Sequence, residues 1–377
     1  MNEKPKRILH VVGAMNRAGA ESMLMTLYRE LDKTEVQFDF LEFTGGRSDF
    51  HDEIEELGGQ ILKCDWSQSL TRVRQTRRSI ALLIDEEGPY TAVHSHILFA
   101  SGTVLAAAKD AGVPTRIAHS HSSSSAHVGF KATVYQKLAR LFINRGATSV
   151  VACSSEAGRY LFGQHFSARG GTVIPNAIDP EMFYPREVNA EGETAAEVSK
   201  ISLISVARLE FVKNHTFLLE LAQELRIRGV EYQMNFVGTG TLQDELETEI
   251  DRLGLGNHVK MLGLRDNVAE ILRGSDVMLM PSLWEGLPVT LVEAQATGLP
   301  CIVSDSVTRE VDLGLGLLSF QPLDNVGQWA DTIANGFPIL PTAEEIAKAL
   351  ETRGYTVRQS LANLLALYGP HQENNNR

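Results

Sequence analysis

Two carboxylates enclose a short turn in the second half of the chain. Glu285 and Glu293 stand eight residues apart, with the sequence GLP at 286–288 between them and apolar runs on both sides. Proline favours the first turn of a helix, so we expect a helix that starts at Pro288 with free backbone N–H groups. Those groups would bind an anion, and the carboxylates would accept hydrogen bonds from hydroxyls. Either glutamate alone is better explained as a turn or helix-surface residue. Their spacing, together with the glycine, the proline and the flanking apolar strands, reverses that preference and predicts a ligand with phosphates and sugar hydroxyls.

A pair of cations follows another predicted strand. Arg208 and Lys213 lie five residues apart in the loop after the strand at 201–207. A guanidinium binds phosphate as a planar fork and an ammonium acts as a point charge, so the pair suits a diphosphate. Basic residues are also common on protein surfaces, and that explanation stays open.

Glycine-containing loops follow two other strands. Gly19 and Glu21 close the loop GAMNRAGAE after the first strand, and Gly238 and Gly240 form the sequence GTG after the strand at 232–237. Glycine lets the backbone approach a ligand closely. Neither loop has the spacing G-x-G-x-x-G, so no dinucleotide site is predicted. An ordinary turn is the better explanation of the first loop taken alone, and GTG without a third glycine does not specify a nucleotide.

Two His-Ser-His triplets end predicted strands. They contain His94 and His96, then His119 and His121. Histidines two apart on a strand face the same way, which makes a metal conceivable. Because no carboxylate, cysteine or H-E-x-x-H completes a ligand set, we predict no metal site. A histidine here would hydrogen-bond a sugar or orient a reacting hydroxyl, or it would be structural.

Short apolar strands alternate with helical patterns, which predicts an α/β protein with parallel sheets covered on both faces. A proline-bearing and then acidic segment near 176–200 separates two such series. We expect two Rossmann-like, doubly wound domains facing each other across a cleft, with ligands outside the carboxyl ends of the strands. The first domain is predicted over 1–178 and the second over 179–355. The clearest helices are predicted at 20–31 and 49–59, and the strands at 7–14, 36–43, 90–96, 115–121, 147–154, 201–207, 232–238, 259–263, 276–282 and 301–305.

The composition is that of a globular enzyme and excludes several classes. Of the 377 residues, 43% are hydrophobic and 22% charged, which is ordinary for a soluble protein. We expect no membrane span, no signal peptide and a cytoplasmic location, since the first apolar run is too short. The three cysteines are far apart and predict no disulfide framework. The net charge of −12 argues against nucleic-acid binding, yet residues 66–178 hold 12 basic and 5 acidic side chains.

The sequence EGLPVTLVE resembles the E-x7-E motif of retaining GT-B glycosyltransferases of family 4. Other segments in the same order strengthen the resemblance: the glycine loop with Glu21, the histidine loop, PNAID at 175–179, the R-L-x-x-x-K segment, and GTG. The combination of RAGAE, IAHSHSS and VIPNAID is most similar to bacterial capsule and exopolysaccharide transferases. One departure is the plain GTG, where an acidic residue often stands between the glycines. The family also implies that a final helix, 356–377, crosses back onto the first domain.

The resemblance assigns roles to individual residues. It implies that Arg208 and Lys213 hold the diphosphate, that Glu285 contacts the donor sugar, and that Glu293 binds ribose. It places His121 near the reacting sugar, with His119 as a rival because the register of the triplet is ambiguous. The implied catalytic set is His121, Glu285, Arg208 and Lys213; donor binding adds Gly19, Gly238, Gly240, Arg265 near the base, Gly286, Leu287, Pro288, Val289 and Glu293; acceptor-side candidates are Glu21, His96 and His119.

We therefore expect a retaining hexosyltransferase that uses a nucleotide sugar, often UDP-linked in this family. The sequence contains no D-x-D, so neither a metal nor another cofactor is expected. The expected acceptor is a saccharide or a polyprenyl-diphosphate-linked saccharide at the inner leaflet of the membrane. Basic helical patterns suit peripheral contact with that leaflet, although their apolar side is also explained by core packing. They contain Arg72, Arg74, Arg77 and Arg78, and then Lys137, Arg140 and Arg145.

Three other functions stay open. A sugar-nucleotide epimerase or a phosphorylase would use the same architecture, but an epimerase needs no acceptor and a phosphorylase needs phosphate or a pyridoxal phosphate lysine, for which no motif is present. A non-catalytic partner subunit would keep the fold and lose the donor motifs, whereas all four of Arg208, Lys213, Glu285 and Glu293 are present.

Overall fold

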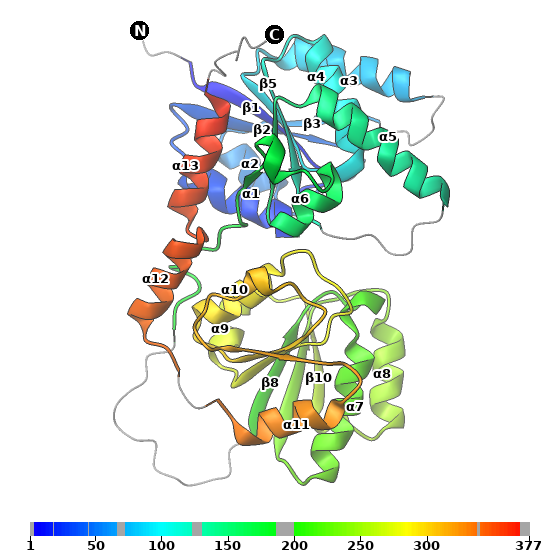
Figure 1. Ribbon diagram of the computed structural model, residues 1–377, viewed down its shortest axis with the longest axis vertical. Coiled ribbons are helices and arrows are strands. Elements are labelled where there is room, and N and C mark those ends of the chain that lie inside the picture. Colours follow the sequence, from blue (N-terminus) through cyan, green and yellow to red (C-terminus); the bar gives the residue numbers. More distant parts are fainter. Residues whose placement is uncertain are drawn as a thin grey trace. The chain divides into compact units, whose positions relative to one another are not determined.

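A computed structural model describes residues 4–17, 19–43, 45–65, 72–122, 130–185, 200–337 and 340–369. The chain forms two compact units (Figure 1). One contains residues 1–177 together with 354–377, and the other contains residues 178–353. The predicted SSSS stretch, the acidic linker beyond residue 185 and the NNNR tail fall largely or wholly outside the described residues.

The first unit is built on seven parallel strands in the order β3-β2-β1-β4-β5-β6-β7. The order reverses between β1 and β4, so the loops after these two strands leave the sheet in opposite directions and open a crevice between them. Two short strands, β3 and β7, were not predicted. The strands are β1 Lys6–Val11, β2 Val36–Glu42, β3 Ile61–Lys63, β4 Ala92–Ser95, β5 Thr115–Ser120, β6 Ser149–Ala152 and β7 Thr172–Val173.

Both faces of this sheet are buried, as its continuous apolar strands predict. Ile8 of β1 packs in the core beneath α1 and α13, whereas its neighbour Leu9 packs in the core beneath α3 and α4. The C-terminal helix α13 contributes Leu364 and Tyr368 to the first of these cores. The helices are α1 Gly19–Glu30, α2 His51–Glu56, α3 Val73–Glu87, α4 Ser101–Asp110, α5 Phe130–Gly146, α6 Ser155–Phe162 and α13 Val357–Tyr368, with 3₁₀ turns η1 Leu98–Ala100 and η2 Ser167–Arg169.

The second unit has six parallel strands in the order β10-β9-β8-β11-β12-β13, and its order reverses between β8 and β11. Trp329 of α11 is fully buried in the core of this unit, with its ring 5.0 Å from that of Phe217 in α7. The strands are β8 Ile201–Val206, β9 Tyr232–Val237, β10 Val259–Gly263, β11 Val277–Met280, β12 Cys301–Ser304 and β13 Leu318–Gln321. The last of these, β13, was not predicted. The helices are α7 His215–Ile227, α8 Gln243–Arg252, α9 Val268–Arg273, α10 Val289–Ala296, α11 Val326–Asn335 and α12 Ala343–Arg353, with 3₁₀ turns η3 Phe211–Lys213 and η4 Arg309–Val311.

Among the described residues, Cys64, Cys153 and Cys301 form no disulfide. Among the described residues, no helix is both long enough and apolar enough to span a bilayer.

Candidate active site

In the second unit, two loops meet at the reversal point of the sheet. One follows β8 and the other follows β11, and these strands are paired side by side. The N–H of Leu283 donates to the Val212 carbonyl at 2.8 Å, and the Asn214 amide donates to the Pro281 carbonyl at 3.2 Å. The two loops therefore form one connected surface at the carboxyl ends of β8 and β11, where doubly wound sheets bind ligands.

An ion pair joins two of the predicted residues on this surface. Lys213 Nζ donates to Glu285 Oε1 at 2.6 Å, and the two side chains are 17% and 11% exposed. Arg208 lies exposed in the same loop, and its guanidinium makes no hydrogen bond or ion pair within the described part of the chain. The site therefore holds one cation that already has a carboxylate partner and one that is open to an anion.

The helix predicted after the turn is α10, and it starts one residue later than expected. Pro288 occupies the position before the first helical residue, with ψ of 100°, so it precedes the helix instead of starting it. No side chain caps the helix. The first N–H groups of any helix lack an acceptor within it, so those of Val289 and Thr290 are available to an anion next to Glu285.

Glu293 lies on α10, inside the helix. Its side chain is partly buried, and burial raises the pKa of the Glu293 carboxyl to about 7. No hydrogen bond or ion pair reaches this carboxyl from any residue that the structure describes. Hydroxyl groups of a ligand that donate hydrogen bonds to such a buried carboxyl would stabilise its ionised form.

The GTG loop has a structural reason for its glycines. A Cβ at Gly238, where φ is +133°, would lie 2.1 Å from the Ala207 carbonyl oxygen. A Cβ at Gly240 would lie 2.3 Å from the Leu209 carbonyl oxygen. The loop is also bonded to its neighbour, since the Leu209 N–H donates to the Thr239 carbonyl at 3.0 Å. Packing of the two loops is therefore sufficient to explain both glycines without a ligand.

Arg265 follows the end of β10. It is exposed beside Leu264, which is 73% exposed. The N–H of Gly238 donates to the Gly263 carbonyl at 2.9 Å and ties the start of this loop to GTG.

In the first unit, five histidines gather at the carboxyl ends of three adjacent strands. His10 comes from β1, His94 and His96 from the end of β4, and His119 and His121 from the end of β5. Ring centroids of neighbouring members are 4.0 to 5.3 Å apart. His10 was not among the predicted site residues. The available signal was a lone histidine in an otherwise apolar strand, facing the same side of the sheet as the triplets.

Hydrogen bonds order these rings. His121 Nδ1 donates to Asn176 Oδ1 at 3.2 Å, because an amide oxygen can only accept. His96 Nδ1 lies 2.9 Å from His121 Nε2, and His10 Nδ1 lies 3.0 Å from His96 Nε2. Burial lowers the pKa of His121 to about 4 and that of His10 to about 3. The rings are therefore neutral near pH 7.

A second branch runs to the C-terminal helix. His119 Nδ1 lies 3.2 Å from His94 Nε2, and His94 Nδ1 lies 2.8 Å from the Tyr368 hydroxyl. Burial lowers the pKa of His94, His96 and His119 well below the usual value. Of the two rivals in the triplet, His119 is fully buried and His121 is partly exposed.

The loop before α1 is anchored by a buried pair that the sequence analysis did not single out. Glu42, at the end of β2, accepts from the Met15 N–H with one carboxylate oxygen and contacts His51 Nε2 at 2.9 Å with the other. A charged residue closing the apolar strand VQFDFLE was the available signal. The helix then starts at Gly19, where a Cβ would meet no atom within 4 Å. Glu21 is partly buried, and burial raises the pKa of its carboxyl.

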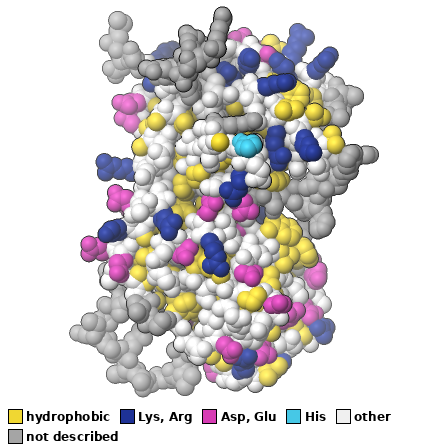
Figure 2. All heavy atoms as spheres, viewed as in Figure 1, with side chains coloured by type: hydrophobic (Ala, Val, Ile, Leu, Met, Phe, Trp, Pro, Cys, Tyr) yellow, Lys and Arg dark blue, Asp and Glu magenta, His cyan; other side chains and the backbone are white. Residues whose placement is uncertain are grey.

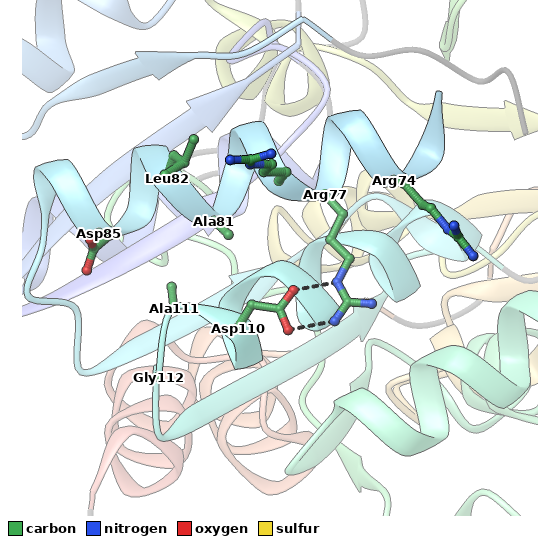
Figure 3. Close-up of a pocket in the computed structure, with 9 residues that line it drawn as sticks. Arg74, Arg77, Ala81, Leu82, Asp85, Asp110, Ala111 and Gly112 are labelled. Carbon is green, nitrogen blue, oxygen red and sulfur yellow. Dashed lines mark hydrogen bonds and ion pairs between the residues drawn. The ribbon is translucent and has the colours of Figure 1, made fainter. Parts of the chain in front are cut away.

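A groove between α3 and α4 contains none of these residues (Figure 3). Arg77 pairs with both carboxylate oxygens of Asp110 at 2.6 Å, and Arg74 lies beside it. The groove is lined by Arg74, Arg77, Arg78, Ala81, Leu82, Asp85, Asp110, Ala111 and Gly112.

Helix α5 presents an apolar stripe to the surface. The exposed members recur at the helical period, so they share one face. Figure 2 shows hydrophobic side chains among Lys and Arg side chains in the region where Figure 1 places α5. Core packing against the described residues leaves about half of each of these side chains exposed. Its residues are Val134, Tyr135, Leu138, Leu141 and Phe142, which are 42–59% exposed.

Two doubly wound parallel sheets, each with polar residues at the carboxyl ends of its central strands, form the GT-B architecture of glycosyltransferases. The chain belongs to the family 4 and group 1 glycosyltransferases. Residues 17–182 match the model described as Glycosyltransferase Family 4, and residues 189–312 match Glycosyl transferases group 1.

Known proteins resemble the chain over most of its length. The glycosyltransferase designated EpsF of Bacillus subtilis (strain 168) is 42% identical over 98% of this chain and 97% of its own. The Escherichia coli UDP-Gal:alpha-D-GlcNAc-diphosphoundecaprenol alpha-1,3-galactosyltransferase is 30% identical over 63% of each chain. The solved structure of Anabaena HepE in complex with UDP shares the fold, with a TM-score of 0.75, 18% identity, and coverage of 96% of this chain and 98% of that one.

Proposed function

We propose that this glycosyltransferase is a retaining hexosyltransferase that moves a sugar from a UDP-linked donor to a saccharide or lipid-linked saccharide in surface polysaccharide synthesis. The observation that carries the proposal is the Lys213–Glu285 pair beside the uncapped start of α10. The ion pair and the helix start together supply a cation, a carboxylate that can accept hydrogen bonds from hydroxyls, and free N–H groups within one connected loop surface. Both the donor sugar and the leaving diphosphate find partners of the right chemistry there.

Each residue then has one task. Lys213 and Arg208 bind the diphosphate, and Glu285 is released from Lys213 to accept hydrogen bonds from donor sugar hydroxyls. Glu293 accepts from the ribose, Arg265 lies toward the base, and the N–H groups of Gly286, Leu287, Val289 and Thr290 bind phosphate oxygen. The C1–O bond to the diphosphate breaks, a bond from C1 to an acceptor oxygen forms on the same face, and the acceptor proton passes to the departing phosphate. Cations and the helix start stabilise the charge that develops, so we expect activity without a metal.

His121 and the first unit serve the acceptor side. His121 is the partly exposed member of its triplet, which supports the role that the resemblance gives it near the reacting sugar, and Gly19 leaves open space at the start of α1. Glu21, His96 and His119 stay candidates for this side. The E. coli relative acts on a sugar joined to diphosphoundecaprenol, which supports a lipid-linked acceptor here. The apolar stripe of α5 supports peripheral contact with the membrane that holds such a lipid.

The test is UDP release from a panel of UDP-hexoses in the presence of diphosphoundecaprenol-linked saccharides. The wild-type protein should release UDP with one hexose and give a product of the donor's anomeric configuration. Glu285→Gln keeps the side-chain shape but loses the charge that the sugar and Lys213 use, so it should fold and lose activity by at least about a hundredfold. Glu351→Gln, an exposed change on α12, is the matched control.

Undiminished turnover in Glu285→Gln would remove this residue from the reacting centre. A donor that changes into its epimer without any acceptor would instead establish the epimerase, and an inverted product would overturn retention.

A further inference from the structure

We propose that His96, His119 and His121 form a binding site for Zn²⁺ in the first unit. One ring nitrogen from each of these histidines lies within 4.8 Å of the others. The three come from the ends of two paired strands, β4 and β5, so the sheet itself fixes their spacing. Three imidazoles on a rigid frame are a known ligand set for Zn²⁺, with a fourth position left for water or a ligand.

Each of the three rings has a partner for the nitrogen that faces away from the ion. His121 Nδ1 donates to Asn176 Oδ1 at 3.2 Å, and His119 Nδ1 lies 3.2 Å from His94 Nε2. His96 Nε2 lies 3.0 Å from His10 Nδ1. Histidines that ligate metals almost always donate their other N–H in this way, which fixes the tautomer and the ring orientation. Asn176, His94 and His10 are therefore the outer partners of the site.

The nitrogens that would face the ion are His121 Nε2, His96 Nδ1 and His119 Nε2. The first two are hydrogen-bonded to each other at 2.9 Å, so the ion would replace that bond. Zn–N bonds of about 2.0–2.1 Å in a tetrahedron separate nitrogens by roughly 3.3 Å, so ring rotations that bring the three nitrogens, which lie within 4.8 Å of one another, to this spacing admit the ion. His119 Nε2 is buried and has no hydrogen-bond partner among the described residues. A buried, unpartnered nitrogen costs free energy, and coordination of an ion would remove that cost.

The ligand chemistry selects the class of ion. Neutral imidazole favours Zn²⁺, Cu²⁺, Ni²⁺ or Co²⁺ over Mg²⁺ or Ca²⁺, which prefer oxygen. A second group, His10, His94 and His96, also has the spacing for a metal. Its members are all buried, whereas His121 gives the proposed site a partly exposed ligand through which an ion can enter.

The effect of Zn²⁺ on sugar transfer rests on the proposed function. Because an ion would hold His121 Nε2, Zn²⁺ and the reacting sugar would compete for His121. Micromolar Zn²⁺ should then inhibit transfer, and EDTA should restore it. Binding itself is independent of activity and is measured separately.

The experiment uses the full chain without a histidine tag, freed of metal by dialysis against chelator. Zn²⁺ affinity is measured by competition with a chromophoric chelator, and Co²⁺ serves as a visible probe of coordination. The wild-type chain should bind one ion and show the intense absorption of tetrahedral Co²⁺. His119→Gln should weaken Zn²⁺ binding at least a hundredfold, and Asn176→Ala, which removes only an outer partner, about 10–100-fold.

His165→Ala is the matched control, because this exposed histidine lies outside the cluster, and it should bind Zn²⁺ as the wild type does. Thermal unfolding of the metal-free variants shows whether each one folds. If His119→Gln does not fold, the Zn²⁺ affinity of Asn176→Ala tests the proposal. No ion bound by the wild-type chain, or equal affinity in the wild type and Asn176→Ala, would overturn the proposal.

Discussion

At the scale of single residues, Lys213 and Glu285 form an ion pair that must separate when the proposed donor binds. The Lys213–Glu285 contact at 2.6 Å joins side chains that are 17% and 11% exposed. Breaking the pair leaves two largely buried charges, each of which needs a new partner. A diphosphate supplies one for Lys213, and sugar hydroxyls supply one for Glu285.

Glu293 carries the pH dependence of nucleoside binding. Burial raises the pKa of its carboxyl to about 7 in the free protein. Ribose hydroxyls donate to the ionised form, so binding should strengthen as pH rises through this value. The ionised fraction grows about tenfold between pH 6 and pH 8, and uridine affinity should grow by the same factor. Calorimetric titration with uridine, which carries no phosphate, measures this directly.

Glu293→Gln is the control, because it cannot ionise. It should bind uridine more weakly and with no slope over this range. A slope equal to that of the wild type would assign the titration to another group.

At the scale of elements, two neighbouring loops after β8 and β9 depend on glycine. A Cβ at Gly240 would lie 2.3 Å from the backbone oxygen of Leu209, and a backbone atom cannot move aside as a side chain can. Gly240→Ala should therefore destabilise the second unit by about 2 kcal/mol or more. Gly19→Ala meets open space and should change stability by less than about 0.5 kcal/mol. Thermal unfolding compares the stabilities of the two variants. Equal unfolding midpoints would contradict the close packing of Gly240 against the Leu209 backbone.

The elements with long apolar runs were predicted from the sequence, and the short ones were not. β7 has two residues, both exposed, and β3 has three, so neither shows a period. β13 has the sequence LSFQ, which is too short and too mixed in polarity to predict a strand. The start of α10 was misplaced by one residue because proline is tolerated both before and inside a first turn.

Part of the candidate site was predicted from the sequence. Loops that follow strands have a recognisable composition, so the residues near β8 and β11 were found. The gathering of His10 with the two triplets depends on strand order and register, and the Glu42–His51 contact joins residues nine apart through a turn. A helical pattern also cannot reveal that the apolar side of α5 is exposed, because exposure depends on what packs against it.

At the scale of the whole molecule, α5 should bring the protein to an anionic membrane. Leu138 and Leu141 are 51% and 53% exposed, and Lys137 and Arg145 are exposed near them. Cosedimentation with vesicles of anionic phospholipid should show binding that weakens as salt rises. Leu138→Asp with Leu141→Asp removes apolar area and adds negative charge, so binding should fall at least about tenfold.

Ile227→Asp is the matched control, because Ile227 is 77% exposed on the second unit. It should bind vesicles as the wild type does. Vesicle binding that is lost equally in both variants would show that α5 is not the contact.

We propose that the second unit holds a UDP-sugar site that needs no metal, and thermal unfolding with nucleotides in EDTA tests this most directly. UDP at about 100 times its Kd should stabilise the protein by about 2.7 kcal/mol, while GDP and ADP should not. Lys213→Ala should weaken UDP more than uridine, because it removes a phosphate contact. No stabilisation by UDP in EDTA, with stabilisation restored by Mg²⁺, would contradict metal independence; no stabilisation by any nucleotide in either condition would contradict the donor site itself.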